Sequence, residues 1–163
     1  MWKSSEAMSS LPEEVRLADV MPVIREKLAK GEPVRLYPKG ISMLPMLRQG
    51  IDSVLLAPVP EKIKKYDLPL YQRRDGQYVL HRILKVGETF TCIGDNQYQY
   101  EPGVRREQLI AVVTGYYRDE EYRSVDTFQY KFYCRFRHWT RRPRHFFRWL
   151  YFGIKHRLTK KAG

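Results

Sequence analysis

The stretch from Leu68 to Ile93 reads LPLYQRRDGQYVLHRILKVGETFTCI and decides the fold class of this chain. Apolar, β-branched and aromatic residues flank Asp75-Gly76, a dipeptide typical of a tight hairpin turn. Gly87-Glu88 indicates a second short turn further on. Sequential strands joined by such short links favour an antiparallel sheet.

Further strands are indicated on both sides of this stretch. Apolar and β-branched runs broken by turn residues recur from Pro33 to Arg118. The predicted strands span residues 34–37, 53–58, 68–73, 77–86, 89–93 and 109–118. We therefore expect a mainly β, antiparallel domain that forms a partly open, barrel-like structure.

An amphipathic helix is predicted before the β domain. Apolar residues fall at helical spacing from Leu17 to Leu28, Ser10 is a candidate N-cap, and Gly31 supplies a stop. Pro22 is expected to kink this helix or to delay its start.

The basic charge of the chain is concentrated after Asp126. The formal net charge is +12, but residues 127–163 hold 11 Lys or Arg and no carboxylate, which leaves +1 for residues 1–126. Half of the aromatic residues also lie in that last segment. We therefore divide the chain into an N-terminal segment, 1–32, a β domain, 33–126, and a basic aromatic tail, 127–163.

Neither export nor membrane spanning is indicated. Residues 1–12 are polar, and no run approaches the roughly 20 apolar residues of a spanning helix. Cys92 and Cys134 lack metal-ligand spacing, so we expect two separate reduced thiols. The expected location is the cytoplasm, with peripheral attachment to the cytoplasmic face of the membrane as an option. No metal or organic cofactor is implied.

Three short motifs in the β domain carry candidate chemistry. Gly-Ile-Ser-Met-Leu-Pro at 40–45 places Ser42 in a loop, His81 lies in the predicted strand 77–86, and Asp95 lies in a Gly-Asp-Asn turn. A serine nucleophile needs a base and oxyanion donors, a neutral imidazole can accept its proton, and a carboxylate can orient the imidazole. Each motif alone also fits an ordinary loop, a structural histidine or an Asx turn.

Taken in order, these motifs resemble those of a known clan. Gly-x-Ser-Met-x-Pro at 40–45, His-Arg-Ile at 81–83, Gly-Asp-Asn at 94–96 and Val-x-Gly at 113–115 are similar to the type I signal peptidases and the LexA-type self-cleaving repressors. The resemblance covers about residues 33–118. It implies a serine peptidase with a signal-peptidase-like or LexA-like β domain, in which Ser42 is the nucleophile and His81 the general base.

The histidine indicates one branch of that clan. Bacterial signal peptidases and the repressors pair serine with lysine, whereas the endoplasmic-reticulum and archaeal type uses histidine, as His81 does here. In that branch the acid lies on or just after the Gly-Asp-Asn turn, and two residues match, Asp95 and Glu101. We rank Asp95 slightly ahead as the essential structural or catalytic acid and keep Glu101 as its rival.

The chain departs from the family in two respects. Gly40 stands where signal peptidases often have a hydroxyl residue, so backbone N–H groups around Ser42 must form the oxyanion hole. The usual N-terminal membrane anchor is not found. The residues around Ser42 are expected to bind an extended peptide or precursor that pairs with a strand edge. They are Gly40, Ile41, Met43 and Pro45.

The tail has three interpretations. Aromatic residues after Pro143 follow helical spacing and cations occupy other positions, as in a helix that lies in a bilayer interface. We predict that residues 127–161 attach the chain to an anionic membrane surface. Packing on the β domain is the second interpretation, and nucleic-acid binding ranks last.

A different class of function is the alternative to a peptidase. The chain would then be a non-catalytic repressor-like or peptide-binding regulator whose basic tail binds nucleic acid or membrane. Against this alternative, no helix-turn-helix pattern precedes the β domain, and both Ser42 and His81 are present.

Overall fold

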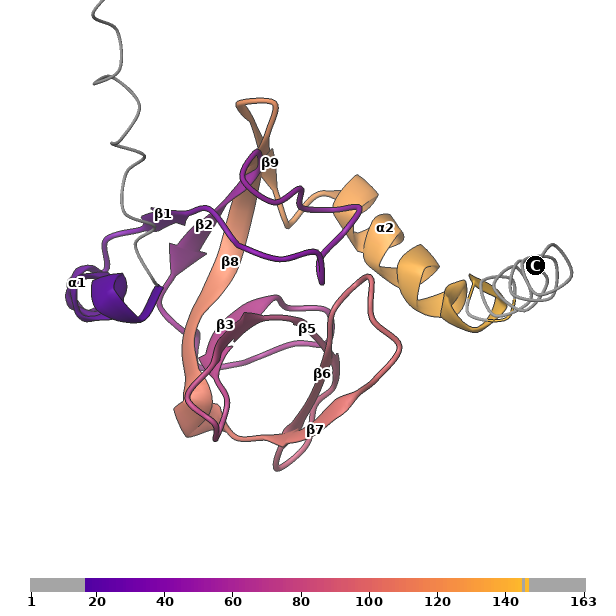
Figure 1. Ribbon diagram of the computed structural model, residues 1–163, viewed down its shortest axis with the longest axis horizontal. Helices are drawn as coiled ribbons and strands as arrows, with labels where there is room; N and C mark the ends of the chain where they lie inside the picture. The colour runs from indigo at the N-terminus through magenta and orange to yellow at the C-terminus, as the bar shows by residue number, and fades with distance from the viewer. Residues whose placement is uncertain (1–16, 145, 147–163) are drawn as a thin grey trace, which may run out of the picture.

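The computed structural model describes residues 17–144 and 146 (Figure 1). In this part of the chain, nine strands and two α-helices follow one another, and every strand pair is antiparallel. The elements are α1 Leu17–Ala29, β1 Val34–Leu36, β2 Ser53–Ala57, β3 Pro69–Gln72, β4 Tyr78–Leu80, β5 Arg82–Lys85, β6 Phe90–Ile93, β7 Glu101–Val104, a 3-10 turn Arg106–Gln108, β8 Leu109–Arg118, β9 Glu121–Ser124 and α2 Phe128–Trp139.

The larger sheet is organised around the long strand β8. Its order is β1-β2-β8-β3-β4, and β9 also pairs with β8. Gly115 in β8 lies opposite Leu55 of β2 and Ser124 of β9. A Cβ placed on Gly115 would collide with the Tyr122 ring. The glycine of the Val-x-Gly motif therefore makes room for an aromatic side chain of the next strand.

The smaller sheet has the order β5-β6-β7, and the chain enters it at His81. The prediction of one continuous strand over 77–86 is wrong at this point, because β4 ends at Leu80 and β5 begins at Arg82. The alternation of side chains survives the break: Leu80 packs in one core cluster and Ile83 in the other. His81 therefore occupies the junction between the two sheets.

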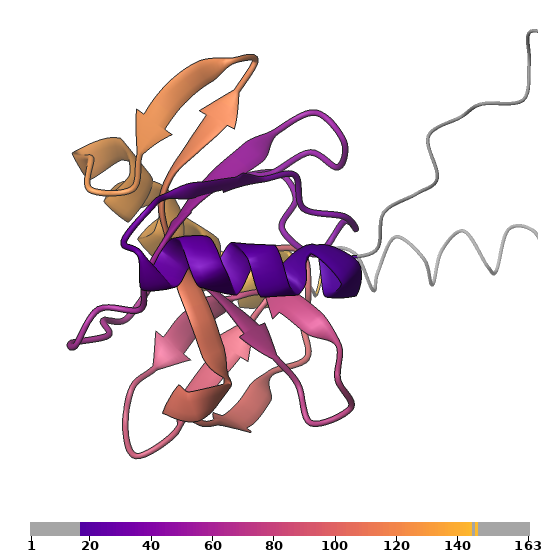
Figure 2. The ribbon, with the colours of Figure 1, turned by 90° about the vertical axis from the view of Figure 1, so that its left-hand side faces the viewer.

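The two helices lie on opposite sides of the strands (Figures 1 and 2). Met21 and Ile24 of α1 are buried in the same core cluster as Tyr130 and Cys134 of α2. The change of composition at Asp126 is thus not a break in packing. The first part of the predicted tail is a helix that helps to cover the β domain.

Several expectations from the sequence can be compared with these elements. A mainly antiparallel β fold with an N-terminal helix is confirmed, but the strands form two sheets that do not close. The helix continues through Pro22, and Gly31 follows its end with φ +76°. Ser10 lies outside the described residues. Strands β7 and β9 were not predicted.

The hairpin turns and the cysteines agree with the sequence analysis. Asp75-Gly76 joins β3 to β4, and Gly87-Glu88 joins β5 to β6. Cys92 and Cys134 are buried free thiols. Within the described ranges, no helix has the length and apolar character needed to cross a membrane.

A buried ion pair connects the start of β5 to the turn after β6. Arg82 Nε donates to Asp95 Oδ1 at 2.9 Å, and Arg82 Nη2 donates to Oδ2 at 2.8 Å. The two residues are 1% and 6% exposed. Burial of the Asp95 carboxyl opposes its ionisation, but Arg82 outweighs this effect and lowers the pKa of Asp95. Four neighbours from α2 and the loop after β1 contact the pair: Tyr130, Tyr133, Cys134 and Met46.

We expect Asp95→Asn to destabilise the fold by about 3–5 kcal/mol, because it leaves Arg82 buried without a counter-charge. Urea unfolding at neutral pH measures this loss. Glu26→Gln, which breaks the exposed pair with Lys30, is the control and should cost less than about 1 kcal/mol.

The pH dependence of the unfolding free energy provides a second measurement of the Arg82–Asp95 pair. Because the pKa of Asp95 is lowered on folding, its contribution is fully present above the ordinary aspartate value of 3.8 and is lost as the pH falls through the lower folded value. Equal losses for Asp95→Asn and Glu26→Gln would show that the buried pair does not stabilise the fold.

Candidate active site

The loop between β1 and β2 carries Ser42 and is fixed at its base by a salt bridge. The buried Asp52 carboxylate accepts the backbone N–H of Arg48 at 2.8 Å and its Nη2 at 2.6 Å. Gly40 has φ +89°, a conformation that favours glycine, and its N–H donates to Gln49 Oε1 at 3.0 Å. Ser42 is therefore presented by a braced loop.

His81 is held by Glu101 of β7. Its Nδ1 lies 3.0 Å from Glu101 Oε1. The Tyr71 hydroxyl donates to Glu101 Oε2 at 2.7 Å, and Arg73 Nε donates to the same oxygen at 2.9 Å. A second guanidinium nitrogen of Arg73 contacts Oε1. With Nδ1–H directed at this carboxylate, the lone pair of the neutral imidazole is on Nε2.

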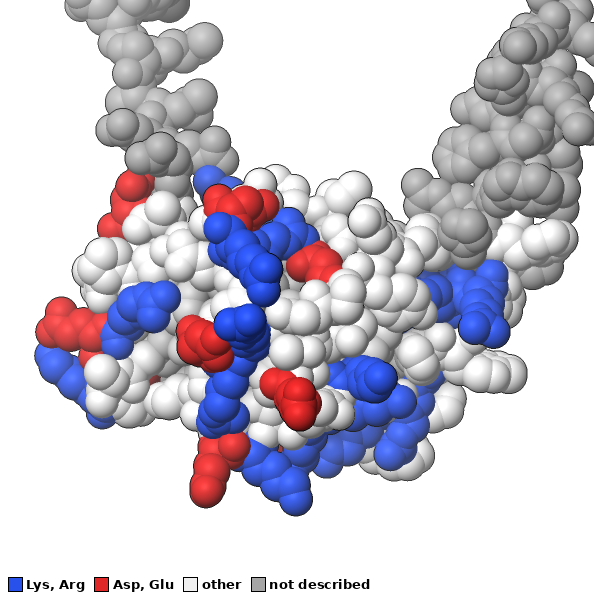
Figure 3. All heavy atoms as spheres, turned by 90° about the horizontal axis from the view of Figure 1, so that it is seen from below, with Lys and Arg blue, Asp and Glu red and all other residues white. Residues whose placement is uncertain are grey.

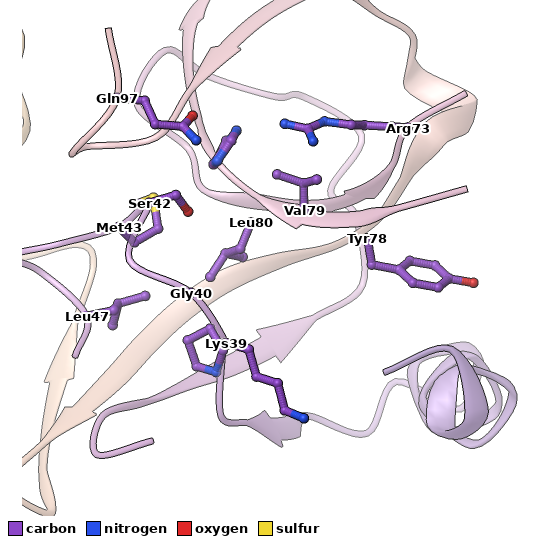
Figure 4. A pocket seen from close by; sticks show the side chains of 12 residues that line it. Lys39, Gly40, Ser42, Met43, Leu47, Arg73, Tyr78, Val79, Leu80 and Gln97 are labelled. Carbon is purple, nitrogen blue, oxygen red and sulfur yellow. The ribbon is translucent and has the colours of Figure 1, made fainter. Parts of the chain in front are cut away.

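Ser42 and His81 line one cleft of about 190 Å³. Figure 4 shows the side chains of Ser42 and Gln97 on one side of this cleft and that of Arg73 on the other. Strand β4, the segment from Pro38 to Gly40, Met43 and Leu47 complete the lining. The cleft therefore combines a hydroxyl, an imidazole and the exposed edge of a sheet.

Gly94 lies between the Ser42 loop and the His81 imidazole. A Cβ at this position would lie 2.7 Å from the Ser42 carbonyl oxygen and 3.1 Å from His81 Nε2. Contact with the backbone oxygen is too close for any side chain. The glycine of the Gly-Asp-Asn turn thus allows Ser42 and His81 Nε2 to approach the same place.

The other two residues of the turn also have defined partners. Asp95 pairs with Arg82, as described above. The Asn96 backbone N–H donates to the Ser42 carbonyl at 2.8 Å, and its side-chain Nδ2 donates to the Ile41 carbonyl at 3.2 Å. The turn therefore anchors the Ser42 loop through its backbone.

Two arginines at the C-terminal end of the described chain reach the same loops. Arg137 Nη2 donates to the carbonyls of Leu44, at 3.2 Å, and Asp95, at 2.6 Å. Arg141 is buried and donates to the Gly94 carbonyl at 3.3 Å. These cations, which the sequence analysis assigned to a tail, brace the candidate site.

The environment sets the protonation states that acid–base chemistry needs. Burial lowers the pKa of His81 below its ordinary value of 6.5, against the opposing effect of the Glu101 carboxylate. Burial opposes ionisation of Glu101, but hydrogen bonds from Arg73 and Tyr71 outweigh it and lower the pKa of Glu101. At neutral pH a neutral imidazole thus faces an ionised carboxylate.

The geometry reverses the order in which the sequence analysis ranked the two acids. Glu101 contacts His81, whereas the Asp95 carboxylate is engaged by Arg82 and Tyr133. The reason lies in the alternation: His81 and Arg82 are adjacent, so their side chains point to different sides and reach different carboxylates. Asp95 is the structural acid, and Glu101 has the position of an orienting acid.

The expected substrate-contacting residues divide into two pairs. Gly40 and Met43 line the cleft. Ile41 is exposed and Pro45, which follows a cis peptide bond, is exposed too, and neither is among the lining residues. Sequence reasoning missed three polar residues of the site, Tyr71, Arg73 and Gln97. Their types are common in strands and turns, and Glu101, which the first two contact, lies on the unpredicted strand β7.

No family model, curated protein or solved structure matches this chain. The resemblance to signal peptidases therefore rests on the motifs alone.

We expect Glu101→Gln to lower the pKa of His81 further, because the carboxylate favours the imidazolium and the amide does not. Asp95→Asn should have a smaller effect on the same pKa. Ring chemical shifts followed by NMR titration measure both values, with His81→Gln used to assign the signal. A larger shift in Asp95→Asn would place the wrong acid beside the histidine.

We expect Gly94→Ala to displace the Ser42 loop and to cost roughly 1–3 kcal/mol of stability, because its Cβ collides with a backbone oxygen. Gly87→Ala is the matched control, since a Cβ there meets only the Thr89 carbonyl at 3.6 Å. Urea unfolding gives the stability, and faster hydrogen exchange at the Asn96 amide reports the loop. Identical behaviour of the two variants would refute the close approach.

Proposed function

We propose that this chain is a serine peptidase in which Ser42 is the nucleophile, His81 the general base and Glu101 the acid that orients the base. One observation carries the proposal. The imidazole is fixed at Nδ1 by an ionised carboxylate 3.0 Å away, while its Nε2 borders the Gly94 position that the Ser42 backbone also contacts.

The reaction follows from these positions. Ser42 Oγ attacks the scissile carbonyl carbon while His81 Nε2 takes the hydroxyl proton, and the tetrahedral intermediate carries the negative charge on the former carbonyl oxygen. His81 then gives that proton to the leaving amine as the C–N bond breaks. A water molecule, deprotonated by His81, hydrolyses the acyl-enzyme and regenerates Ser42.

The role of Glu101 is to keep His81 in the productive tautomer. With Nδ1–H donating to Glu101, Nε2 is the only acceptor of the ring, and the carboxylate stabilises the imidazolium that forms. Tyr71 and Arg73 hold both oxygens of Glu101, so the acid itself cannot rotate away. These two residues act as positioning residues.

The oxyanion must be stabilised by donors near Ser42. The Gly40 N–H is engaged by Gln49. The Ser42 N–H has no hydrogen-bond partner among the described residues, which leaves it available to an oxyanion. The backbone at the nucleophile, rather than a side chain two residues earlier, therefore supports this step.

The cleft favours an extended peptide as substrate. Strand β4 is the last strand of the larger sheet, and all three of its residues line the cleft. A peptide could pair with this edge and pass between His81 and Ser42, as extended ligands commonly add to a sheet. The smaller sheet begins directly after His81, so the peptide would cross the junction between the sheets.

Labelling by a fluorophosphonate probe tests the nucleophile without a known substrate. We expect one adduct, on Ser42, whose formation rises with pH through the His81 pKa, which lies below 6.5. Tryptic mass spectrometry identifies the site. Absence of an adduct on a chain with a normal unfolding midpoint would favour the non-catalytic peptide-binding alternative.

Cleavage of a proteome-derived peptide library tests the remaining roles. Ser42→Ala and His81→Ala should each lower the rate roughly a thousandfold or more, because residues that act as a unit are lost as a unit. Glu101→Gln should lower it roughly a hundredfold or more at a temperature where the variant is fully folded. In Asp95→Asn, any loss of rate should accompany the loss of stability. The assignment fails if Asp95→Asn is stable and inactive while Glu101→Gln retains full activity.

A further inference from the structure

Helix α2 has a second face that the active site does not use. Opposite its buried side, four large aromatic residues lie at positions i, i+4, i+8 and i+11 and form the outer face of α2. They are Phe128, Phe132, Phe136 and Trp139, with exposed fractions of 78%, 58%, 49% and 78%. The rings of Phe128 and Phe132 stack with centroids 6.4 Å apart, and those of Phe132 and Phe136 with centroids 6.1 Å apart. A continuous apolar stripe therefore faces outward.

This stripe is not the consequence of an undocked helix. Tyr130 and Cys134, on the opposite side of α2, belong to the main core cluster, and Arg137 bonds the carbonyls of two loops. The orientation of the helix about its own axis is fixed by these contacts. The aromatic rings are outward because the other side of the helix is fully engaged.

Cations run along one edge of the outer face. At 3.6 residues per turn, Lys131 and Arg135 of α2 lie next to the stripe on the same side of it. Lys131 has one exposed carboxylate neighbour, Asp126, at 3.5 Å. No acidic residue follows Asp126 in the chain. The surface thus combines apolar rings with positive charge that has little local compensation.

The rest of the molecule is different. Residues 1–126 carry a formal charge of only +1. On the face seen in Figure 3, acidic side chains lie among the basic ones over much of the β domain. An excess of positive charge is thus not a general property of the surface. It is specific to the segment that begins with α2.

We propose that the outer face of α2 docks on an anionic lipid bilayer. Aromatic rings enter the interface between headgroups and acyl chains, and the neighbouring cations contact anionic headgroups. Charge complementarity selects this partner over two others. An apolar protein groove would contact the rings but not the cations. The phosphate backbone of a nucleic acid would contact the cations but leave the rings in water.

Docking of α2 on a bilayer has a consequence for the candidate site. This consequence rests on the proposed peptidase function. Arg137, on the inner side of α2, bonds the carbonyls of Leu44 and Asp95, and Arg141, just after α2, bonds that of Gly94. A bilayer bound to the outer side therefore holds the cleft at a fixed, short distance from the membrane surface. The substrates reached most readily are extended peptide segments next to that surface.

The test is sedimentation of the full chain with vesicles of phosphatidylcholine alone or mixed with phosphatidylserine, at low and high salt. All proteins carry Ser42→Ala, so that binding is measured independently of catalysis. We expect binding to the anionic vesicles, a loss of about fivefold for each of Lys131→Gln and Arg135→Gln at low salt, and residual binding at high salt through the rings. Truncation at Asp126 is unsuitable because it removes Tyr130 and Cys134 from the core.

The decisive variant replaces the four aromatic residues of the outer face by Gln, which preserves helix propensity. We expect at least a tenfold loss of vesicle binding with an unchanged unfolding midpoint. The matched control is Val23→Gln with Ile51→Gln, two apolar residues that are each 55% exposed elsewhere on the surface, and it should bind as the parent does.

Three results would overturn the proposal. They are unaltered vesicle binding by the outer-face variant, equal recovery of the parent chain in the supernatant with both lipids, and tight binding of duplex DNA without lipid binding. Because the nucleophile is absent from every protein used, a failed peptidase assay leaves this result unaffected.

Discussion

The buried pair of Arg82 and Asp95 is the interaction on which the rest of the site depends. A guanidinium and a carboxylate that are almost fully removed from water must satisfy each other and nearly all of their remaining hydrogen-bonding groups. Their partners come from distant parts of the chain: the loop after β1, the turn after β6 and α2. His81 precedes Arg82, and Gly94 precedes Asp95. Fixing the pair therefore also fixes its neighbours His81 and Gly94, and Gly94 lies against the Ser42 carbonyl.

Two carboxylates six residues apart have different tasks because they meet different cations. Both Asp95 and Glu101 are partly or fully buried, and in both the neighbouring arginine outweighs burial and keeps the acid ionised. Asp95 balances a charge inside the protein, whereas Glu101 leaves one oxygen directed at an imidazole. The difference follows from the backbone: adjacent side chains on an extended segment point to opposite sides, so Arg82 and His81 cannot share one acid.

Much of the β domain could be predicted from the sequence, and the parts that could not have physical reasons. Strand β8 was predicted with its full bounds because eight of its ten residues are apolar, β-branched or aromatic. Strands β7 and β9 were missed because Glu-Pro-Gly-Val at 101–104 and Glu-Tyr-Arg-Ser at 121–124 have the composition of turns. The break at His81 was missed because a change of sheet preserves the alternation on both sides. The contact of Glu101 with His81 could not be predicted, because it depends on β7, whose pairing with β6 puts Glu101 opposite Cys92.

The cations of α2 show why composition cannot separate a binding surface from a structural brace. Arg135 and Arg137 are two residues apart and chemically identical, yet one lies on the exposed side of the helix and the other bonds the Leu44 and Asp95 carbonyls. The carbonyl partners belong to the backbone, so no residue type in the sequence signals them. When α2 packs against the strands, the arginines on the inner side of this segment bind main-chain oxygens of the two loops that form the site. Only the remaining cations are available for a partner. The first half of the basic aromatic tail is therefore part of the structure that positions Ser42, His81 and the turn between them.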